Sequence, residues 1–327
     1  MKNTKYISIL ILVLSVSATA QAQTLSSIPG SFVDVGFGTR PVGMGFAYVG
    51  LADDENAPYW NPAGLGHIQE ITAGFSQIDQ MGLITYNYAS GIMPLPGLKH
   101  AVGLSVISSG DDALKELSAH VAYGIKLNIV NVGLALKYRN ASFGNNSLNR
   151  DDYVVFDDAE IDAGFAQQVY GDANGFGADF GVMVNPTKEL RFGLLIRDFI
   201  APMNWSSQAR GADYQAKGDY SEGLPMEIIV GSSYKISENF LAAVDFQPAT
   251  DSERTNFFRV GVEGRLVNVL MLRAGTEQGV NDLDDEKYTL GTGLDIKLKD
   301  KIRIKTDFAY VIEPIQNSQR ISFTISL

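Results

Sequence analysis

Five pairs of adjacent aspartates are the groups in this chain best suited to chemistry, because clustered carboxylate oxygens are the ligands that Ca²⁺ prefers. The pairs are Asp53–Asp54, Asp111–Asp112, Asp151–Asp152, Asp157–Asp158 and Asp284–Asp285. None of them has the spacing of an EF-hand loop. We therefore interpret them as solvated loop tips, and a bridging cation is the minority alternative.

Histidine, cysteine and glycine motifs offer no better catalytic or metal site. The three histidines, His67, His100 and His120, lie far apart without metal-ligand spacing, and the chain has no cysteine. We expect His120 to be a solvated histidine on the polar side of a strand. The Gly175-Phe176-Gly177 run stands in an alternating segment with no helix after it, so it does not have the context of a nucleotide-binding loop. The sequence predicts no enzyme, no cofactor and no metal.

The elements that must carry these residues are strands, because apolar and polar residues alternate along most of the chain. In one segment Val130, Val132, Leu134, Leu136 and Tyr138 occupy one side and smaller or polar residues occupy the other. Segments of this kind continue from residue 70 to residue 327. The fold class predicted is all-β: a transmembrane antiparallel β-barrel of about fourteen strands. With this face assignment, Leu134→Arg should impair assembly far more than Gly133→Arg.

The expected strands and their connections support a barrel. We place strands at residues 70–78, 82–93, 99–108, 115–126, 129–140, 173–184, 189–199, 225–236, 239–247, 255–265, 268–278, 286–298, 301–312 and 319–327. Alternate connections are short, and those between them are mostly longer and acidic, as in residues 141–171 and 202–223. Short turns at one end and longer loops at the other are typical of outer-membrane barrels.

The N-terminus predicts export. Lys2 and Lys5 precede an apolar run, and the small residues of Ala20-Gln21-Ala22 form a cleavage site, so residues 1–22 read as a signal peptide. The domain organisation predicted is therefore a leader (1–22), an N-terminal plug segment (23–69) and a barrel (70–327). Without the two leader lysines, the 26 basic residues become 24 against 37 acidic ones, a net charge of −13. This balance excludes a nucleic-acid binder.

The strand faces that point into the barrel carry charges of both signs, which favours a lumen filled by salt bridges, or one that contacts a plug, over an ion-selective pore. Plain solvation of the barrel interior explains these charges at least as well. These residues are Lys137, Asp179, Arg197, Glu227, Asp245, Arg259, Glu263, Arg273, Asp295, Arg303 and Asp307.

Residues 23–69 do not alternate and are rich in glycine and alanine. Small residues allow close packing, so we expect this segment to form a small plug, or hatch, in one end of the barrel. Pro62 should end any short helix that precedes it.

This segment resembles a known family. The runs Arg40-Pro41-Val42-Gly43-Met44-Gly45, Ala52-Asp53-Asp54 and Tyr59-Trp60-Asn61-Pro62-Ala63-Gly64-Leu65 are similar to the N-terminal signature of the PorV/PorQ outer-membrane proteins of Bacteroidetes. That family is related to the FadL long-chain fatty acid transporters. The family-motif residues carried over are Arg40, Gly43, Gly45, Asp53, Asp54, Trp60, Asn61, Pro62, Ala63 and Gly64.

The resemblance implies an integral outer-membrane protein that contacts lipid and assists type IX secretion without being an enzyme. Its expected partners are the type IX translocon and the C-terminal signal domains of exported cargo proteins. The alternative is a FadL-like transporter of hydrophobic small molecules such as long-chain fatty acids. In that case Met44, Phe46, Tyr48 and Trp60 would contact the ligand, although packing of the plug explains these four residue types better. A general diffusion porin is the third option.

Overall fold

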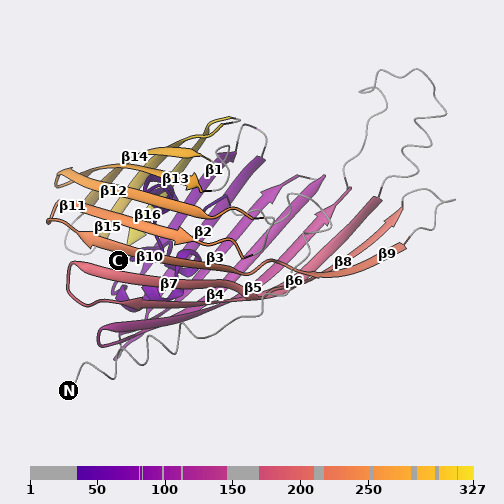
Figure 1. The fold of residues 1–327 in the computed structure, drawn as a ribbon, viewed down its shortest axis with the longest axis horizontal. Helices are drawn as coiled ribbons and strands as arrows, with labels where there is room; N and C mark the ends of the chain where they lie inside the picture. The colour runs from indigo at the N-terminus through magenta and orange to yellow at the C-terminus, as the bar shows by residue number, and fades with distance from the viewer. Residues whose placement is uncertain are drawn as a thin grey trace.

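Fourteen strands close into an antiparallel barrel (Figure 1). The computed structural model describes residues 35–327 except 81, 83, 98, 112, 146–168, 210–216, 251–253, 281–285, 299–301 and 315. The strands of the closed wall are β1 (Thr72–Gln80), β2 (Ile84–Pro94), β3 (His100–Gly110), β4 (Leu114–Leu127), β5 (Val130–Phe143), β6 (Val169–Val184), β7 (Leu190–Ile200), β10 (Glu227–Lys235), β11 (Phe240–Gln247), β12 (Phe257–Val267), β13 (Leu270–Gly279), β14 (Lys287–Leu298), β15 (Ile302–Ile312) and β16 (Ser318–Ser326). The first and last strands pair, with Thr72 opposite Ser326, and this pairing closes the wall.

All fourteen predicted strands are found, but the prediction of a loop over residues 202–223 is wrong. Two further strands lie there, β8 (Pro202–Ala209) and β9 (Lys217–Gly223). Strand β8 pairs with the first part of β6, and β9 pairs with β8. Strand β8 does alternate, but its outward residues are polar instead of apolar, so it lacks the apolar outer face that is typical of a membrane-spanning strand.

The predicted face assignment is confirmed. Leu134 points outward and is 43% exposed, whereas the neighbouring Gly133 faces inward. The structure indicates that Gly133→Arg would also be costly. A Cβ atom at Gly133 would overlap the backbone of Pro62, because the inside of the wall is in contact with another part of the chain.

Connections of different length lie at the two ends of the barrel, as predicted. The short turns follow β2, β4, β6, β10, β12 and β14. We call this the short-turn end, and it also holds the start of β1 and the end of β16. The opposite, long-loop end carries the connections after β5, β7, β11 and β13. There β8 and β9 project beyond the ends of most other strands (Figure 1).

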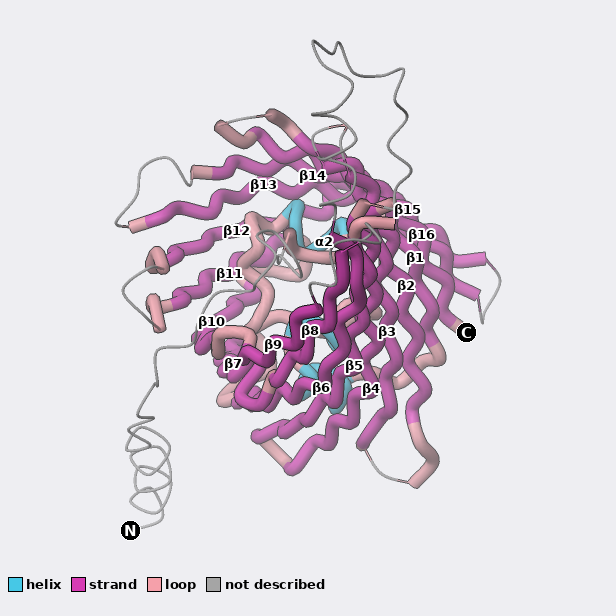
Figure 2. The backbone as a smooth tube through the Cα atoms, turned by 90° about the vertical axis from the view of Figure 1, so that its right-hand side faces the viewer, coloured by secondary structure: helices cyan, strands magenta, loops and turns pink. Residues whose placement is uncertain are grey.

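Residues 35–69, which we call the internal segment, lie inside the ring of strands (Figure 2). The segment contains α2 (Thr39–Gly43), α3 (Ala57–Trp60) and the 3₁₀ helix η1 (Pro62–His67). Helix α3 ends before Asn61, which is extended with φ −165°, and Pro62 then begins η1, so the predicted effect of Pro62 is confirmed. The main apolar core of the protein forms between this segment and the wall, and it includes Met44, Tyr48 and Leu65.

No helix in the described residues is long and apolar enough to cross a membrane. The predicted signal peptide, residues 1–22, lies outside the described residues.

Candidate functional site

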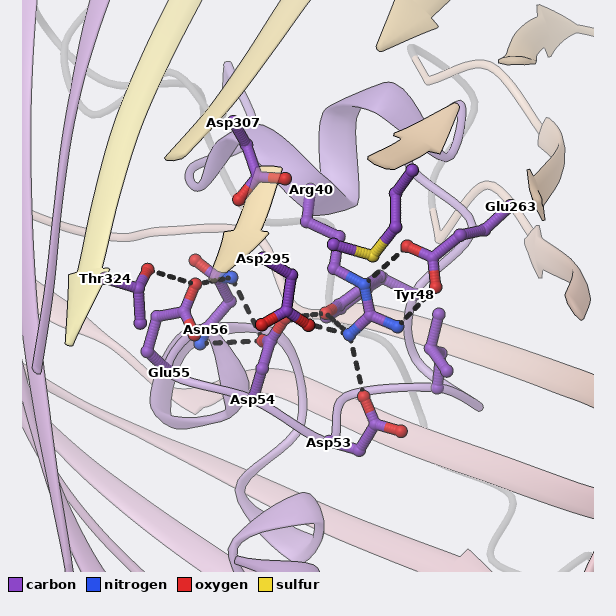
Figure 3. Close-up of polar contacts among 12 residues, drawn as sticks. Arg40, Tyr48, Asp53, Asp54, Glu55, Asn56, Glu263, Asp295, Asp307 and Thr324 are labelled. Carbon is purple, nitrogen blue, oxygen red and sulfur yellow. Dashed lines mark hydrogen bonds and ion pairs between the residues drawn. The ribbon is translucent and has the colours of Figure 1, made fainter. Parts of the chain in front are cut away.

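Arg40, on helix α2, is the centre of a buried polar network inside the barrel (Figure 3). Its Nη1 atom donates to Asp53 Oδ1 at 2.8 Å, to Asp54 Oδ2 at 2.9 Å and to the Tyr48 hydroxyl at 3.0 Å. Tyr48 in turn donates a hydrogen bond to Asp54. One guanidinium thus holds together three parts of the internal segment that are separated in sequence.

The same guanidinium joins the internal segment to the wall. Its Nε and Nη2 atoms bind both oxygens of Glu263 on β12, at 2.9 and 3.0 Å. Glu263 also accepts a hydrogen bond of 2.6 Å from Arg273 on β13, and Arg273 forms a second ion pair with Asp307 on β15 at 2.6 Å. A planar, bidentate pair of this kind fixes orientation as well as distance. The internal segment is therefore oriented against β12–β15 by charge.

Asp53 and Asp54 are not solvated loop tips, so that prediction is wrong for this pair. Asp53 forms ion pairs with Arg40 and with Arg191 of β7, the latter at 3.0 Å, and Asp54 is buried. Burial alone would raise the pKa of Asp53, but Arg40 and Arg191 hold it well below its ordinary value. Both acids are structural partners of arginine.

Two cavities lie against this network at the short-turn end. One has a volume of about 200 Å³ and is lined by charged groups that include Arg40, Asp53, Glu263 and Lys305. The other, of about 250 Å³, lies between the turns that follow β6 and β10 and shares Asp53 and Glu263 with the first. Both have walls of mixed charge, and neither is lined by Met44, Phe46, Tyr48 or Trp60.

Glu55 has a different environment on the other side of the internal segment. Its Oε1 atom accepts hydrogen bonds from Thr324 of β16 at 3.0 Å and from Asn56 at 3.2 Å. Its Oε2 atom is buried without a partner among the described residues, and none of their lysines or arginines forms an ion pair with it. Burial, with the charge of Asp54 next, raises the pKa of Glu55 to about 7.

The glycines of the motif permit close contact between the internal segment and the wall. Gly45 has φ +60°, and a Cβ atom there would overlap the backbone of Val260 and Thr276. The wall also has glycines at this contact: Gly261 and Gly275 face the backbone of Met44 and Gly45. Backbone thus packs against backbone where any side chain would separate the two.

Asn61, the first residue of the Asn-Pro-Ala element, forms hydrogen bonds with separate parts of the internal segment. Its Nδ2 atom donates to the Val49 carbonyl at 2.9 Å, and its Oδ1 atom accepts the Ala63 N–H at 3.1 Å. The nearby Gly64 leaves room for the Ala52 carbonyl. These contacts explain the element by packing and hydrogen bonding.

The aromatic residues of the motif form a cluster within the core. The ring centroid of Trp60 lies 5.8 Å from that of Tyr48 and 5.7 Å from that of Tyr59, and its indole N–H donates to the Phe37 carbonyl at 2.6 Å. Tyr59 stacks on His120 at 5.9 Å. The prediction of a solvated His120 is therefore wrong, because the internal segment covers it. Met44 and Phe46 are buried in the same core.

Inward-facing side chains of both signs form salt bridges along the wall, which confirms the predicted salt-bridged lumen. Lys137 lies 2.6 Å from Asp179 and 3.0 Å from Asp198, and Arg259 pairs with Glu277. The sequence placed Glu263, Arg273 and Asp307 on the inner face, but it did not connect them with Arg40. It missed Arg191 and Glu55 altogether, and no signal local to either residue reveals its partner. Within the described ranges, no group of three or more His, Asp or Glu residues could hold a metal ion.

Comparison with protein families identifies the chain. The profile of the type IX secretion system membrane protein PorP/SprF matches residues 55–327. The chain belongs to the PorP/SprF family. The resemblance drawn from the motifs, to PorV/PorQ, is confirmed as far as its link with type IX secretion. No curated protein matches this PorP/SprF member significantly.

Solved structures confirm the fold. The CymD monoaromatic hydrocarbon channel is similar with a TM-score of 0.60 and 17% identity, and the alignment covers 89% of this chain and 97% of that one. The Ralstonia pickettii toluene transporter TbuX is similar with a TM-score of 0.58 and 13% identity, and the alignment again covers 89% of this chain and 97% of the other. A Pseudomonas aeruginosa FadL homologue is similar with a TM-score of 0.54 and 12% identity, and the alignment covers 87% of this chain and 96% of the other. The barrel is thus of the FadL type, and the family and these neighbours are secretion or transport proteins.

Proposed function

We propose that this PorP/SprF protein is a non-enzymatic accessory barrel of type IX secretion, located in the outer membrane, which binds or escorts exported proteins. The family match over residues 55–327 is the observation that carries the proposal. The similarity of residues 40–65 to the PorV/PorQ signature supports the same role. Outer-membrane barrels have short turns on the periplasmic side, so the short-turn end would face the periplasm and the long-loop end would face the cell exterior.

The filled interior favours a binding role over an open pore. The internal segment is buried from Val42 to Ala52 and from Ala57 to Leu65, and it contacts strands around the wall. Arg40, Asn61 and the paired glycines hold it in place. We propose that it acts as a plug that closes the lumen to free diffusion. Exported protein would then meet the outer surface of the barrel at its long-loop end, not pass through the lumen.

Affinity purification from detergent-solubilised membranes tests the function. We expect the tagged barrel to retain type IX translocon components or exported proteins with C-terminal signal domains, identified by mass spectrometry. Deletion of the gene should reduce the surface delivery of those same exported proteins. An unrelated outer-membrane barrel of the same cell, tagged in the same way, is the control. Normal delivery in the deletion strain would contradict the proposal.

The second candidate is transport of a hydrophobic small molecule. It is favoured by the FadL-type fold and by the aromatic cluster around Trp60 inside the barrel. Met44, Phe46, Tyr48 and Trp60 would contact such a ligand if the internal segment moved. Lipid extraction of the purified protein decides between the two: bound fatty acid or aromatic hydrocarbon in stoichiometric amount would favour transport.

A further inference from the structure

The β8–β9 hairpin leaves one strand of the barrel with a single neighbour. Each strand of the closed wall pairs on both sides, and β8 pairs with β6 and β9. Strand β9 pairs with β8 alone among the described strands. An unpaired strand edge presents a row of backbone donors and acceptors to which another strand can add.

The hydrogen-bond pattern shows which residues of β9 face the open edge. In an antiparallel pair, alternate residues direct both backbone groups toward the neighbouring strand and the others direct them away. The carbonyl of Ala201, directly before β8, accepts the backbone N–H of Leu224, and the carbonyl of Gly218 accepts a bond from the Ser207 hydroxyl. Odd-numbered residues of β8 therefore direct their backbone groups toward β9. Their partners in β9 are the even-numbered residues. Asp219 and Ser221 therefore direct their N–H and C=O groups to the open edge.

The hairpin stands beyond the apolar belt of the wall. The outward pair Tyr138 and Phe176 is apolar and exposed, and it marks the limit of the belt on β5 and β6. Farther toward the long-loop end, two polar rows cross the outer face of β5, β6, β8 and β9. One row is Asn140, Asn174, Asn204 and Ser221, and the other is Ser142, Asp172, Ser206 and Asp219. Polar rows of this kind belong in water, so the open edge is accessible to a soluble partner.

The edge is held rigidly and is not blocked by its own charges. The indole of Trp205 donates to Glu222 at 2.8 Å, and Trp205 packs in an apolar cluster with Met203 and Leu224 behind the hairpin. The carboxylate of Asp219 accepts a bond of 2.9 Å from Ser206 on β8, so it turns along the sheet and not across the edge. Natural edges are commonly protected by proline, lysine or a bulge. Strand β9 has no proline and no bulge, and its one lysine, Lys217, is the first residue of the strand, away from Asp219 and Ser221.

We propose that the open edge of β9 binds, by strand addition, an extended lysine- or arginine-bearing segment of an exported protein. This inference rests on the proposed function. The acidic connections at the long-loop end favour a basic partner segment over an acidic one. Residues 144–168 include six acidic residues and one arginine, and residues 281–286 include four acidic residues and no basic one. An acidic strand would be repelled there and a basic one attracted.

Hydrogen exchange on the full-length protein in lipid nanodiscs tests strand addition. The probe is a blocked eight-residue peptide of alternating lysine and valine. We expect it to slow amide exchange at Asp219 and Ser221 about tenfold, and to leave the amides of β16 unchanged. A glutamate–valine peptide, and a lysine–valine peptide N-methylated at alternate residues, should give no protection. Equal protection by the N-methylated peptide, or none by the parent peptide, would overturn the proposal.

A matched pair of substitutions isolates the backbone donor. Ser221→Pro removes the edge-facing N–H without removing a β8–β9 bond, and Ser221→Ala retains it. We expect the proline variant to bind the probe about fivefold more weakly or worse and the alanine variant to bind as the wild type does. Asp219→Pro is the second such variant, and heat-modifiable electrophoretic mobility verifies that each barrel has folded.

In cells, the same pair separates this proposal from the proposed function. Loss of surface delivery with Ser221→Pro, but not with Ser221→Ala, would support both. Normal delivery with Ser221→Pro, in a strain where gene deletion abolishes delivery, would overturn the strand-edge proposal and leave the secretion role intact. Normal delivery after gene deletion would reject the secretion role, and the exported segment would be rejected with it as the occupant.

Discussion

The internal segment is held on two sides of the barrel by different physical means. Toward β12–β15 the contacts are charged and close: Arg40 binds Glu263 with two hydrogen bonds, and Gly45 lies against Gly275. Toward β16, β1 and β2 the contacts are packing and hydrogen bonds to neutral groups: Glu55 accepts hydrogen bonds from Thr324 and Asn56, its side chain covers Gly74, and Arg320 donates to the Gly36 carbonyl. The first side is oriented by ion pairs of Arg40 with Glu263, Asp53 and Asp54. The second depends on Glu55, a buried carboxyl group that forms no ion pair with any residue the structure describes, so the two sides should respond differently to substitution and to pH.

Arg40→Met should have the largest effect. It leaves Glu263, Asp53 and Asp54 buried with less positive charge, and breaking one partner of a buried ion pair costs about 3–5 kcal/mol. Urea unfolding in lipid vesicles, followed by tryptophan fluorescence, measures the change. The double variant Arg40→Met/Glu263→Gln should recover part of the loss, and a double variant as unstable as the single one would show that Glu263 is not the main partner.

Gly45→Ala should come next, at about 2–3 kcal/mol, because the new methyl group overlaps the wall and the backbone has a positive φ. Gly91→Ala is the matched control, since nothing lies within 4 Å of a Cβ atom at that position. We also expect Gly45→Ala to raise single-channel conductance in planar bilayers, because it displaces the internal segment. Conductance unchanged by a destabilising Gly45→Ala would count against a plugging role.

Glu55 should make the second side sensitive to pH. The raised pKa, about 7, means that the folded protein binds a proton at Glu55 that the unfolded chain releases above its ordinary pKa of 4.5. Stability should therefore fall as pH rises from about 5 to 7, with a slope of at most about 1.4 kcal/mol per pH unit. The neighbouring groups are Asp54, Asp307 and Lys305. Glu55→Gln should flatten this dependence, and an unaltered pH profile in that variant would assign it to another group.

Gly74→Ala should have the smallest effect, about 1 kcal/mol or less, although its methyl group would lie 2.7 Å from Glu55 Cγ. The atom it meets belongs to a flexible side chain, which can shift, whereas Gly45 meets backbone. Measured by the same unfolding experiment, a cost equal to that of Gly45→Ala would show that the two sides are equally rigid.

Local patterns in the sequence were sufficient to predict the wall of the barrel. Alternation along segments such as residues 130–139 predicted the strands, their outward and inward faces and the parity of the turns, because each of these depends on residues close together in the chain. The pattern failed at β8 and β9, where the outward residues are polar instead of apolar. It also missed the surroundings of Gly133 and His120, since neither residue reveals that the internal segment lies against it.

What the sequence determined by itself was therefore a barrel with an apolar outer face and a compact non-alternating segment before it. The tertiary structure decided which groups of that segment meet which strands: Arg40 is 223 residues from Glu263, and Glu55 is 269 residues from Thr324. Contacts over such separations follow from closure of the wall and from the fit of one surface to another, and no short stretch of sequence encodes them. The same holds for the unpaired edge of β9, which exists only because β6 pairs with both β7 and β8.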